Sequence, residues 1–157
     1  MSNYYQQEPK EFSETVIEIK RISKKTKGGN QIRFSALVVI GDRKGRVGLG
    51  LSKAKDVRSA VNKSISAAKR KLFNVPLSGS TIPHSVICKF SAARVMLKPA
   101  PPGSGIIAGG PMRVVLDAAG IRDAVGKILG TKNKASNVYA TFEALKKVAE
   151  IAERRSV

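Results

Sequence analysis

The side chains of this chain that are best suited to binding a ligand are lysines and arginines, which lie in short clusters beside glycines. One cluster is the turn at 24–30, Lys-Lys-Thr-Lys-Gly-Gly-Asn, and a second is the turn at 41–45, Gly-Asp-Arg-Lys-Gly. A third surrounds the start of the helix expected from residue 56. Such cations neutralise phosphates, which gives a favourable and salt-dependent free energy of binding. We therefore expect phosphate contacts from Lys24, Lys25, Lys27, Arg43, Lys44, Lys53, Lys55, Arg58 and Arg70.

Two glycines in the first cluster have a separate role. Gly28 and Gly29 can adopt positive φ without steric cost, so we expect them to let the hairpin tip approach an RNA backbone closely.

Catalytic chemistry has little support in the sequence. There is no GxxxxGK[ST] loop, no nucleophile elbow and no HExxH motif. The one histidine, His84, and the one cysteine, Cys88, are expected as half-buried residues of a strand rather than as a metal or catalytic pair. The few aspartates, among them Asp42 and Asp56, are expected to cap helices or compensate charge. The sequence predicts no enzyme, no cofactor, no metal site and no small-molecule substrate.

One loop invites a different interpretation, because Gly103 to Ala108 satisfies the GxGxxA form of the dinucleotide fingerprint and Asp123 follows at a suitable distance. A true fingerprint needs a larger doubly wound sheet, and only 47 residues remain after Gly110. Nucleotide binding is therefore not favoured. Two alternatives stay open: an anion held at the following helix N-terminus, or a tight loop that packs or forms a protein interface.

Composition favours a polyanionic partner. With 29 Lys and Arg against 11 Asp and Glu, the formal charge is +18 on 157 residues, of which +13 falls within residues 16–75. A hydrophobic content of 42% is enough for a core. No apolar run approaches the roughly 18 residues that a membrane span needs. The acidic-leaning start and the single cysteine indicate a cytoplasmic protein, with a plastid-encoded origin left open.

The first half predicts a β-β-β-α unit. A hairpin joins strands at 12–23 and 31–40, and Ile32, Phe34, Ala36, Val38 and Ile40 are expected on a face that is buried throughout. In the third strand Gly48 and Gly50 allow close approach of RNA or of another part of the protein. A helix follows from Asp56, and its expected apolar stripe, which should pack on the three strands, is Val57, Val61, Ile65, Ala68 and Leu72.

The second half predicts a β-β-α-β-α order. Strands are expected from about residue 82 to 90 and from 93 to 98, a helix over 111–119, and a final helix over 135–154. Residues 121–129 are expected as a strand, although a helix also fits. The fold class is α+β, with two small domains: a flexible N-terminus at 1–11, a first domain at 12–75, a linker at 76–81 and a second domain at 82–157.

A family resemblance is carried by residues 28–57, GGNQIRFSALVVIGDRKGRVGLGLSKAKDV, and by residues 103–113, GSGIIAGGPMR, followed by GTKN at 130–133. These stretches resemble the bacterial small-subunit ribosomal protein number five family. The resemblance implies a structural, two-domain protein. Its first domain would be of the double-stranded-RNA-binding type, and its second would be domain-two-like, with a left-handed β-α-β crossover. Asn30 departs from the Lys, Arg or Gln usual in the family.

The resemblance also implies partners. The hairpin at 24–30 would contact 16S ribosomal RNA near the spectinomycin site, close to the mRNA entry path, in a protein that contributes to subunit assembly and decoding accuracy. Gly103, Gly105 and Arg113 would meet small-subunit ribosomal protein four, and protein eight would be another neighbour. The alternative is a free-standing double-stranded-RNA-binding regulator that acts outside the ribosome.

Overall fold

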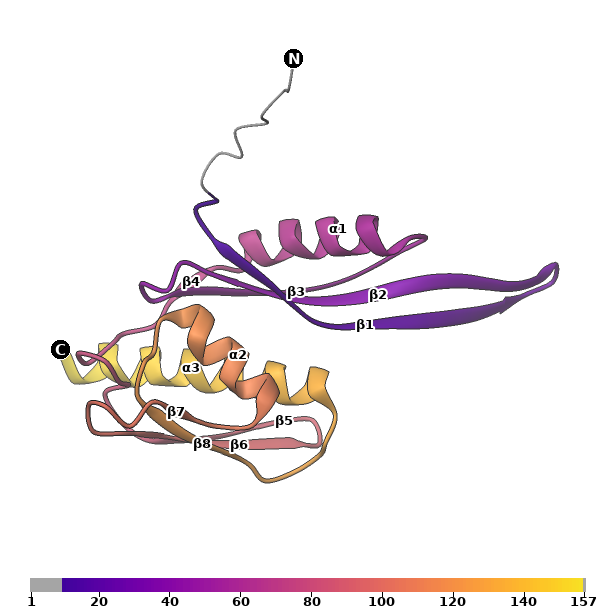
Figure 1. Cartoon of the computed structure of the whole chain (residues 1–157). Helices are drawn as coiled ribbons and strands as arrows, with labels where there is room; N and C mark the ends of the chain where they lie inside the picture. Colours follow the sequence, from indigo (N-terminus) through magenta and orange to yellow (C-terminus); the bar gives the residue numbers. More distant parts are fainter. Residues whose placement is uncertain (1–9, 157) are drawn as a thin grey trace, which may run out of the picture.

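The computed structural model describes residues 10–156, so most of the predicted flexible segment lies outside the described residues. The strands are β1 (Ser13–Thr26), β2 (Gly29–Gly41), β3 (Arg46–Ala54), β4 (Phe73–Asn74), β5 (Val86–Phe90), β6 (Ala93–Pro99), β7 (Ile106–Ile107) and β8 (Ala124–Ile128); the helices are α1 (Val57–Arg70), α2 (Gly110–Ala119) and α3 (Lys134–Ser156). β1 to β4 form one sheet and β5 to β8 another. The predicted α+β class with two domains is confirmed (Figure 1).

The first domain is an antiparallel sheet in the order β1-β2-β3-β4, with α1 on one face (Figure 1). α1 begins where the sequence predicts, because the Asp56 carboxylate accepts a hydrogen bond from the backbone N–H of Ser59 at 3.3 Å. The prediction of three strands was incomplete, since β4 pairs with the start of β3. A strand of two residues has no periodicity from which it could be recognised.

The glycines of β3 bring α1 against the sheet. A Cβ built on Gly48 would overlap the carbonyl oxygen of Ala68, and a Cβ built on Gly50 would overlap that of Ser64. The backbone that approaches these glycines is therefore α1, not RNA. The Ser64 hydroxyl donates to the carbonyl oxygen of Ala36 in β2 at 2.8 Å, which fixes the helix further.

The predicted apolar stripe of α1 was wrong in part. The buried residues of the helix are the small ones, Ala60, Ser64 and Ala68, whereas Val57 is 38% exposed. Large side chains do not fit where the backbones of α1 and β3 nearly touch. Val61, Ile65 and Leu72 therefore pack against the sheet beside this contact, as predicted, but only as half-buried residues.

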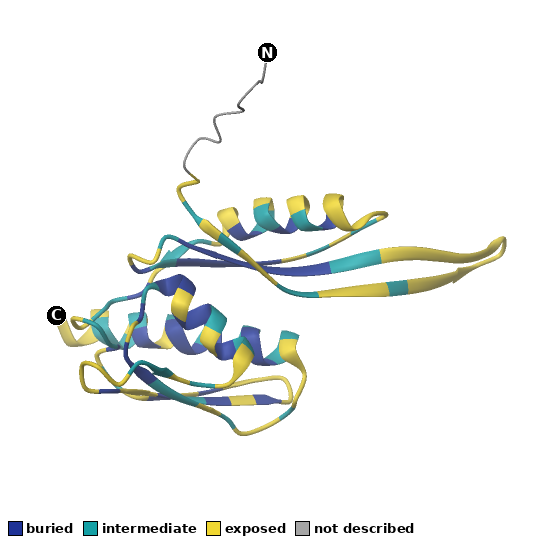
Figure 2. Cartoon of the chain, in the orientation of Figure 1, coloured by how far each residue is buried: buried dark blue, intermediate teal, exposed yellow. Residues whose placement is uncertain are grey.

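β1 and β2 continue beyond β3 as a two-stranded ribbon that projects from the body of the molecule (Figure 1). β3 ends opposite Phe34, so from residue 33 to the tip β2 has only β1 as its neighbour in the sheet. This part is exposed on both faces (Figure 2), and Ile32 is 43% exposed. The prediction of a face buried along all of β2 was wrong at this end, because no helix covers it.

The second domain is a sheet in the order β5-β6-β8-β7, with α2 and α3 on the same face (Figure 1). β7 runs parallel to β8, so β7, α2 and β8 form a β-α-β unit, whose left hand stays a prediction. β7 was missing from the predicted order, since two isoleucines in a glycine-rich loop do not show a strand pattern. Residues 124–128 form a strand, which resolves the alternative of a helix. β5 begins only at Val86, so His84 lies before the strand that was expected to contain it.

The two domains share one hydrophobic core. Leu37 of β2 and Leu49 of β3 are buried in the same cluster as Met112 and Leu116 of α2 and Leu145 of α3. The first sheet is thus covered by α1 on one face and by the helices of the second domain on the other. One face of the first sheet therefore has its apolar core completed by the second domain.

The predicted linker is hydrogen-bonded to the second domain. The carbonyl oxygen of Ser80 accepts hydrogen bonds from the backbone N–H groups of Arg122 and Asp123, both at 3.0 Å. A bridge between Ser78 and Thr81 closes the segment into a tight turn. The connection between the domains is therefore short and held against the second domain.

Candidate nucleic-acid interface

The end of the ribbon carries the first group of predicted site residues. The turn itself is only Lys27 and Gly28, because β1 ends at Thr26 and β2 begins at Gly29. The wider turn predicted at 24–30 was therefore wrong: Lys24 and Lys25 belong to β1 and pair with Gln31 and Asn30. All three lysines are exposed.

The two glycines of the tip differ from each other. Gly29 has a φ of +123°, which only glycine adopts easily, whereas Gly28 is not among the residues with positive φ. The expectation of positive φ at both was thus wrong for Gly28. Around both positions there is open space, since a Cβ on either glycine would meet no atom within 4 Å.

Cations occupy both faces of the ribbon. Residues alternate across a strand, and Leu37 of β2 faces the second domain while Val38 faces α1. By the register of β1 with β2, Lys24 and Arg33 share the face of Leu37, and Lys25 lies on the opposite face. The ribbon can therefore contact phosphates on two sides.

The second group lies near the start of α1. Lys55 and Arg58 are exposed beside the first turn of the helix. Lys53 of β3 is also exposed, and it pairs with Ser35, which places it on the face of the sheet opposite α1. The basic helix start predicted from sequence is thus divided between two faces.

The remaining predicted cations lie at the other end of the sheet. Arg43 and Lys44 belong to the turn between β2 and β3, and Arg70 ends α1. β2 has 13 residues, so at about 3.3 Å a residue the turn lies roughly 40 Å from the tip of the ribbon. The eleven predicted residues therefore do not form one patch, and they would reach well-separated parts of an RNA.

The turn between β2 and β3 is tightly built. The Asp42 carboxylate accepts hydrogen bonds from the backbone N–H of Lys44 at 2.8 Å and from Nε of Arg46 at 2.7 Å. Although partial burial acts to raise the pKa of Asp42, these hydrogen bonds outweigh it and hold the pKa below its usual value. Asp42 is therefore structural, as predicted for a turn carboxylate.

The same turn closes the C-terminus of α2. The backbone N–H of Arg43 donates to the carbonyl oxygen of Ala118 at 3.2 Å, and that of Gly45 donates to the carbonyl oxygen of Ala119 at 2.9 Å. These are carbonyls that the helix itself leaves without partners. Arg43 has a φ of 59°, a conformation costing of order 1 kcal/mol or more for a residue with a side chain. The interdomain hydrogen bond holds it there.

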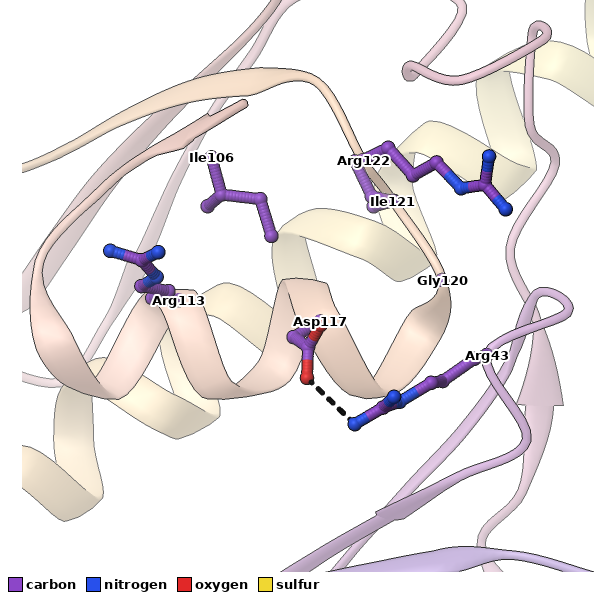
Figure 3. A pocket seen from close by; sticks show the side chains of 7 residues that line it. All are labelled: Arg43, Ile106, Arg113, Asp117, Gly120, Ile121 and Arg122. Carbon is purple, nitrogen blue, oxygen red and sulfur yellow. Dashed lines mark hydrogen bonds and ion pairs between the residues drawn. The ribbon is translucent and has the colours of Figure 1, made fainter. Parts of the chain in front are cut away.

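A pocket of about 420 Å³ opens where this turn meets the second domain. It is lined by Arg43, Ile106, Arg113, Asp117, Gly120, Ile121 and Arg122 (Figure 3). Arg43 reaches toward Asp117 and forms an ion pair at 3.4 Å, whereas Arg113 and Arg122 point in different directions. Arg43, predicted to contact RNA, and Arg113, predicted to contact a protein, thus lie around one opening.

The glycine-rich loop at 103–110 is held in place by a carboxylate of the second domain. The Asp123 carboxylate accepts a hydrogen bond from the backbone N–H of Gly105 at 2.9 Å. Hydrogen bonds from Ser80 and from that N–H lower the pKa of Asp123. Gly103 and Gly105 have φ values of +91° and +71°. The aspartate considered as a ribose ligand therefore holds the loop itself.

Comparison with known proteins decides the family. A model described as "Ribosomal protein S5, N-terminal domain" matches residues 12–76, and one described as "Ribosomal protein S5, C-terminal domain" matches residues 88–155. The chain belongs to the ribosomal protein S5 family. It is also similar to "Small ribosomal subunit protein uS5" of Chloroflexus aurantiacus, with 48% identity over 146 residues, which cover 93% of this chain and 82% of that relative.

Membership of the ribosomal protein S5 family establishes the chain as a structural protein of the small ribosomal subunit and not an enzyme. The protein is therefore part of the ribosome and functions in translation. Whether that ribosome lies in a bacterial cytoplasm or in a plastid stays a prediction. No helix among residues 10–156 is long and apolar enough to cross a membrane.

Sequence reasoning missed several cations of the β1-β2 hairpin. Lys20, Arg21 and Arg33 are exposed, but they were assigned to strands expected to be half-buried. The signal that could have found them is their number, because a strand that packs on a core seldom carries so many cations. Lys20 also pairs with Glu18 at 3.5 Å.

His84 and Cys88 are not arranged as a metal-binding or catalytic pair. Cys88 is buried in β5, and the pKa of His84 is lowered by burial and by the positive charge of Arg155. Within residues 10–156 no group of three or more His, Cys, Asp or Glu side chains could hold a metal ion.

Proposed function

We propose that this ribosomal protein binds 16S ribosomal RNA through its first domain, with the β1-β2 ribbon inserted between RNA surfaces. The observation that carries the proposal is the position of cations on both faces of a ribbon that no other described element covers. Lys24 and Arg33 lie on one face and Lys25 on the other. A ribbon that packed on protein would keep one face apolar, whereas RNA on both sides supplies phosphates to each.

The second and third groups extend the proposed RNA contact along the domain. Lys53, Lys55 and Arg58 lie near the base of the ribbon, and the group of Arg43, Lys44 and Arg70 lies at the far end of the sheet. By the family resemblance, the ribbon tip would lie near the spectinomycin site and the mRNA entry path. There the protein would contribute to subunit assembly and decoding accuracy. Asn30 lies opposite Lys25 and is exposed, so it offers an amide where the family usually has a longer side chain.

The second domain is proposed to contact small-subunit ribosomal protein four. Gly103 and Gly105 shape a loop that the Asp123 carboxylate holds in place, and Arg113 is exposed in the first half of α2. A fixed backbone beside a free guanidinium is suited to a protein neighbour that offers a carboxylate. Protein eight is proposed as a further neighbour, with no residues assigned to it.

The test is binding of the purified chain to a small-subunit ribosomal RNA fragment and to a generic RNA duplex across a salt series. A preference for the ribosomal fragment that survives at high salt is expected, together with a steep dependence of log K on log salt. Equal affinity for both RNAs would mean that charge alone drives binding. Co-sedimentation with small subunits in a moderate-salt wash separates this function from that of a free-standing regulator, which would remain in the soluble fraction.

The ribbon tip offers a sharper test with the Gly28→Val variant. Because Gly28 has open space and no positive φ, a valine there should leave the free protein folded while placing bulk where the RNA backbone would approach. We expect unchanged unfolding and weakened RNA binding or subunit assembly. Normal incorporation into subunits with an unchanged RNA footprint would contradict the proposed insertion of the tip.

A further inference from the structure

One of the two faces of the second sheet is not covered by any helix or strand among residues 10–156. α2 and α3 both lie on the other face (Figure 1), where Val95 and Leu97 are fully buried. Because side chains alternate along a strand, the residues between the buried ones point outward. These outward residues, which we call the open sheet face, are Ile87 and Lys89 of β5, Arg94, Met96 and Lys98 of β6, Val125 and Lys127 of β8, and Ile107 of β7.

The open sheet face carries four cations and no carboxylate. No Asp or Glu occurs in any of its four strands. Within residues 10–156, none of the four cations forms an ion pair with a carboxylate. The positive charge of this face is therefore not compensated by the described part of the protein.

Two of these cations stand directly opposite each other. The register pairs Lys89 with Arg94 on neighbouring strands, and directly opposite residues have Cβ atoms about 5 Å apart. Like charges in such positions destabilise a sheet. An anion from outside the protein would turn this repulsion into a bridging contact.

The other two cations extend the array over three strands. Lys127 lies opposite Met96, and Lys98 lies four residues beyond Arg94, at about 13 Å along the strand. The spacing suits several anionic groups held in a row better than one small anion. This points to a polymer with regularly repeated charges.

The composition of the face separates RNA from a protein partner. Protein interfaces centre on aromatic or arginine anchors and are depleted in lysine. The open sheet face has no aromatic residue, and three of its four cations are lysines, which bind phosphate as point charges. Its exposed isoleucines, Ile87 at 54% and Ile107 at 58%, stand on different strands and do not form a single anchor.

We propose that the open sheet face is a second RNA-binding surface, which contacts the phosphate backbone of ribosomal RNA. This inference rests on the proposed RNA-binding function and extends it to the second domain. The face is distinct from the pocket around Arg43, and it shares only Ile107 with the loop at 103–110.

The first test uses a charge-removal variant in the full chain, with Lys89, Arg94, Lys98 and Lys127 each replaced by Gln. A matched control replaces four exposed cations of α3 by Gln: Lys134, Lys147, Arg154 and Arg155. Each phosphate contact contributes about 0.9 to the slope of log K against log salt on a B-form duplex and about 0.7 on a single strand, and we take this range for ribosomal RNA. The face variant should therefore lose about 3 to 4 from the slope measured on small-subunit ribosomal RNA, and the control should keep the wild-type slope. A folded face variant with the wild-type slope would overturn the proposal.

The second test locates the RNA. Ile87→Cys in a Cys88→Ala background gives a single exposed thiol to which a hydroxyl-radical source can be attached. Cleavage of ribosomal RNA at a discrete cluster of nucleotides in reconstituted subunits is expected. No RNA cleavage, with cross-linking from this position to another ribosomal protein, would show that the face docks protein and would overturn the proposal.

The two proposals can fail separately. If wild-type protein showed no affinity for ribosomal RNA, the proposed function itself would be wrong. If ribbon variants weakened binding while the face variant and its control behaved alike, only the second surface would be excluded.

Discussion

The junction between the domains predicts that Gly120→Ala will destabilise the protein far more than an ordinary glycine substitution. Gly120 ends α2 with a φ of +86°, and a Cβ built on it would overlap the backbone of Arg43 in the first domain. The alanine must therefore adopt a strained φ and also push the β2-β3 turn away from the helix.

The magnitude follows from these two effects. The left-handed conformation costs an alanine about 1 kcal/mol. Moving the turn breaks the hydrogen bonds from Arg43 to Ala118 and from Gly45 to Ala119, each contributing about 1 kcal/mol net. The free energy of unfolding should fall by about 3 kcal/mol, which at a slope of about 2 kcal/mol per M lowers the urea midpoint by about 1.5 M.

Gly79→Ala is the matched control. Gly79 has a φ of +66°, but a Cβ there would meet no atom within 4 Å. The Gly79→Ala variant should therefore lose only the part of the free energy of unfolding that comes from backbone conformation, about 1 kcal/mol. Urea unfolding of both variants, followed by circular dichroism, measures the difference. Equal losses would refute the reasoning, because they would mean that the close packing of the two domains contributes nothing to stability.

Further predictions concern the same junction. Arg43→Gly should relieve the strain at φ 59° and leave the free energy of unfolding unchanged or higher, while weakening RNA binding; a loss of stability in urea would contradict this assignment. Because the folded pKa of Asp42 lies below the unfolded value of 3.8, its contribution to stability is complete above about pH 5 and is lost as the pH falls below 3.8. Asp42→Asn should therefore be less stable at pH 7 and show less further loss on acidification, which unfolding at pH 7 and pH 3 would check. The shared core predicts that the slowest amide protons of β2 and β6 exchange with the same free energy of opening; two separate values would indicate independent domains.

The sequence predicted those elements whose signals are local. α1 follows from Asp56 as its cap, and α2 from the proline in its first turn. The class of partner follows from net charge. The cations clustered in the turns and around the start of α1 were also singled out, since clustering is a property of the sequence alone, whereas Lys20, Arg21 and Arg33 within strands were not.

What the sequence did not predict depends on contacts between distant segments. The glycines at 48 and 50 could have faced RNA or protein, and only the packing of α1 decides between them. Ile32 belongs to the alternating apolar pattern of β2, which is typical of a buried face. It is nevertheless exposed, because the ribbon extends beyond the described elements that could cover it. Likewise, no pattern shows that the turn at 42–45 caps a helix 74 residues later, although that contact determines how Arg43 is placed.

The shared core has a consequence for how this protein would hold RNA. A ribbon with cations on both faces and no covering helix gains little stability from its own packing, so its direction must be set where β1 and β2 enter the body. There Leu37 and Val39 of β2 pack against the helices of the second domain, and Val38 and Ile40 pack against α1 on the other face. If the domains moved independently, the ribbon and the open sheet face would bind RNA as two weak, loosely linked sites. Because the core and the capped end of α2 fix them relative to each other, the proposed second contact would form without a further loss of orientational freedom, and the two surfaces would bind RNA as one site.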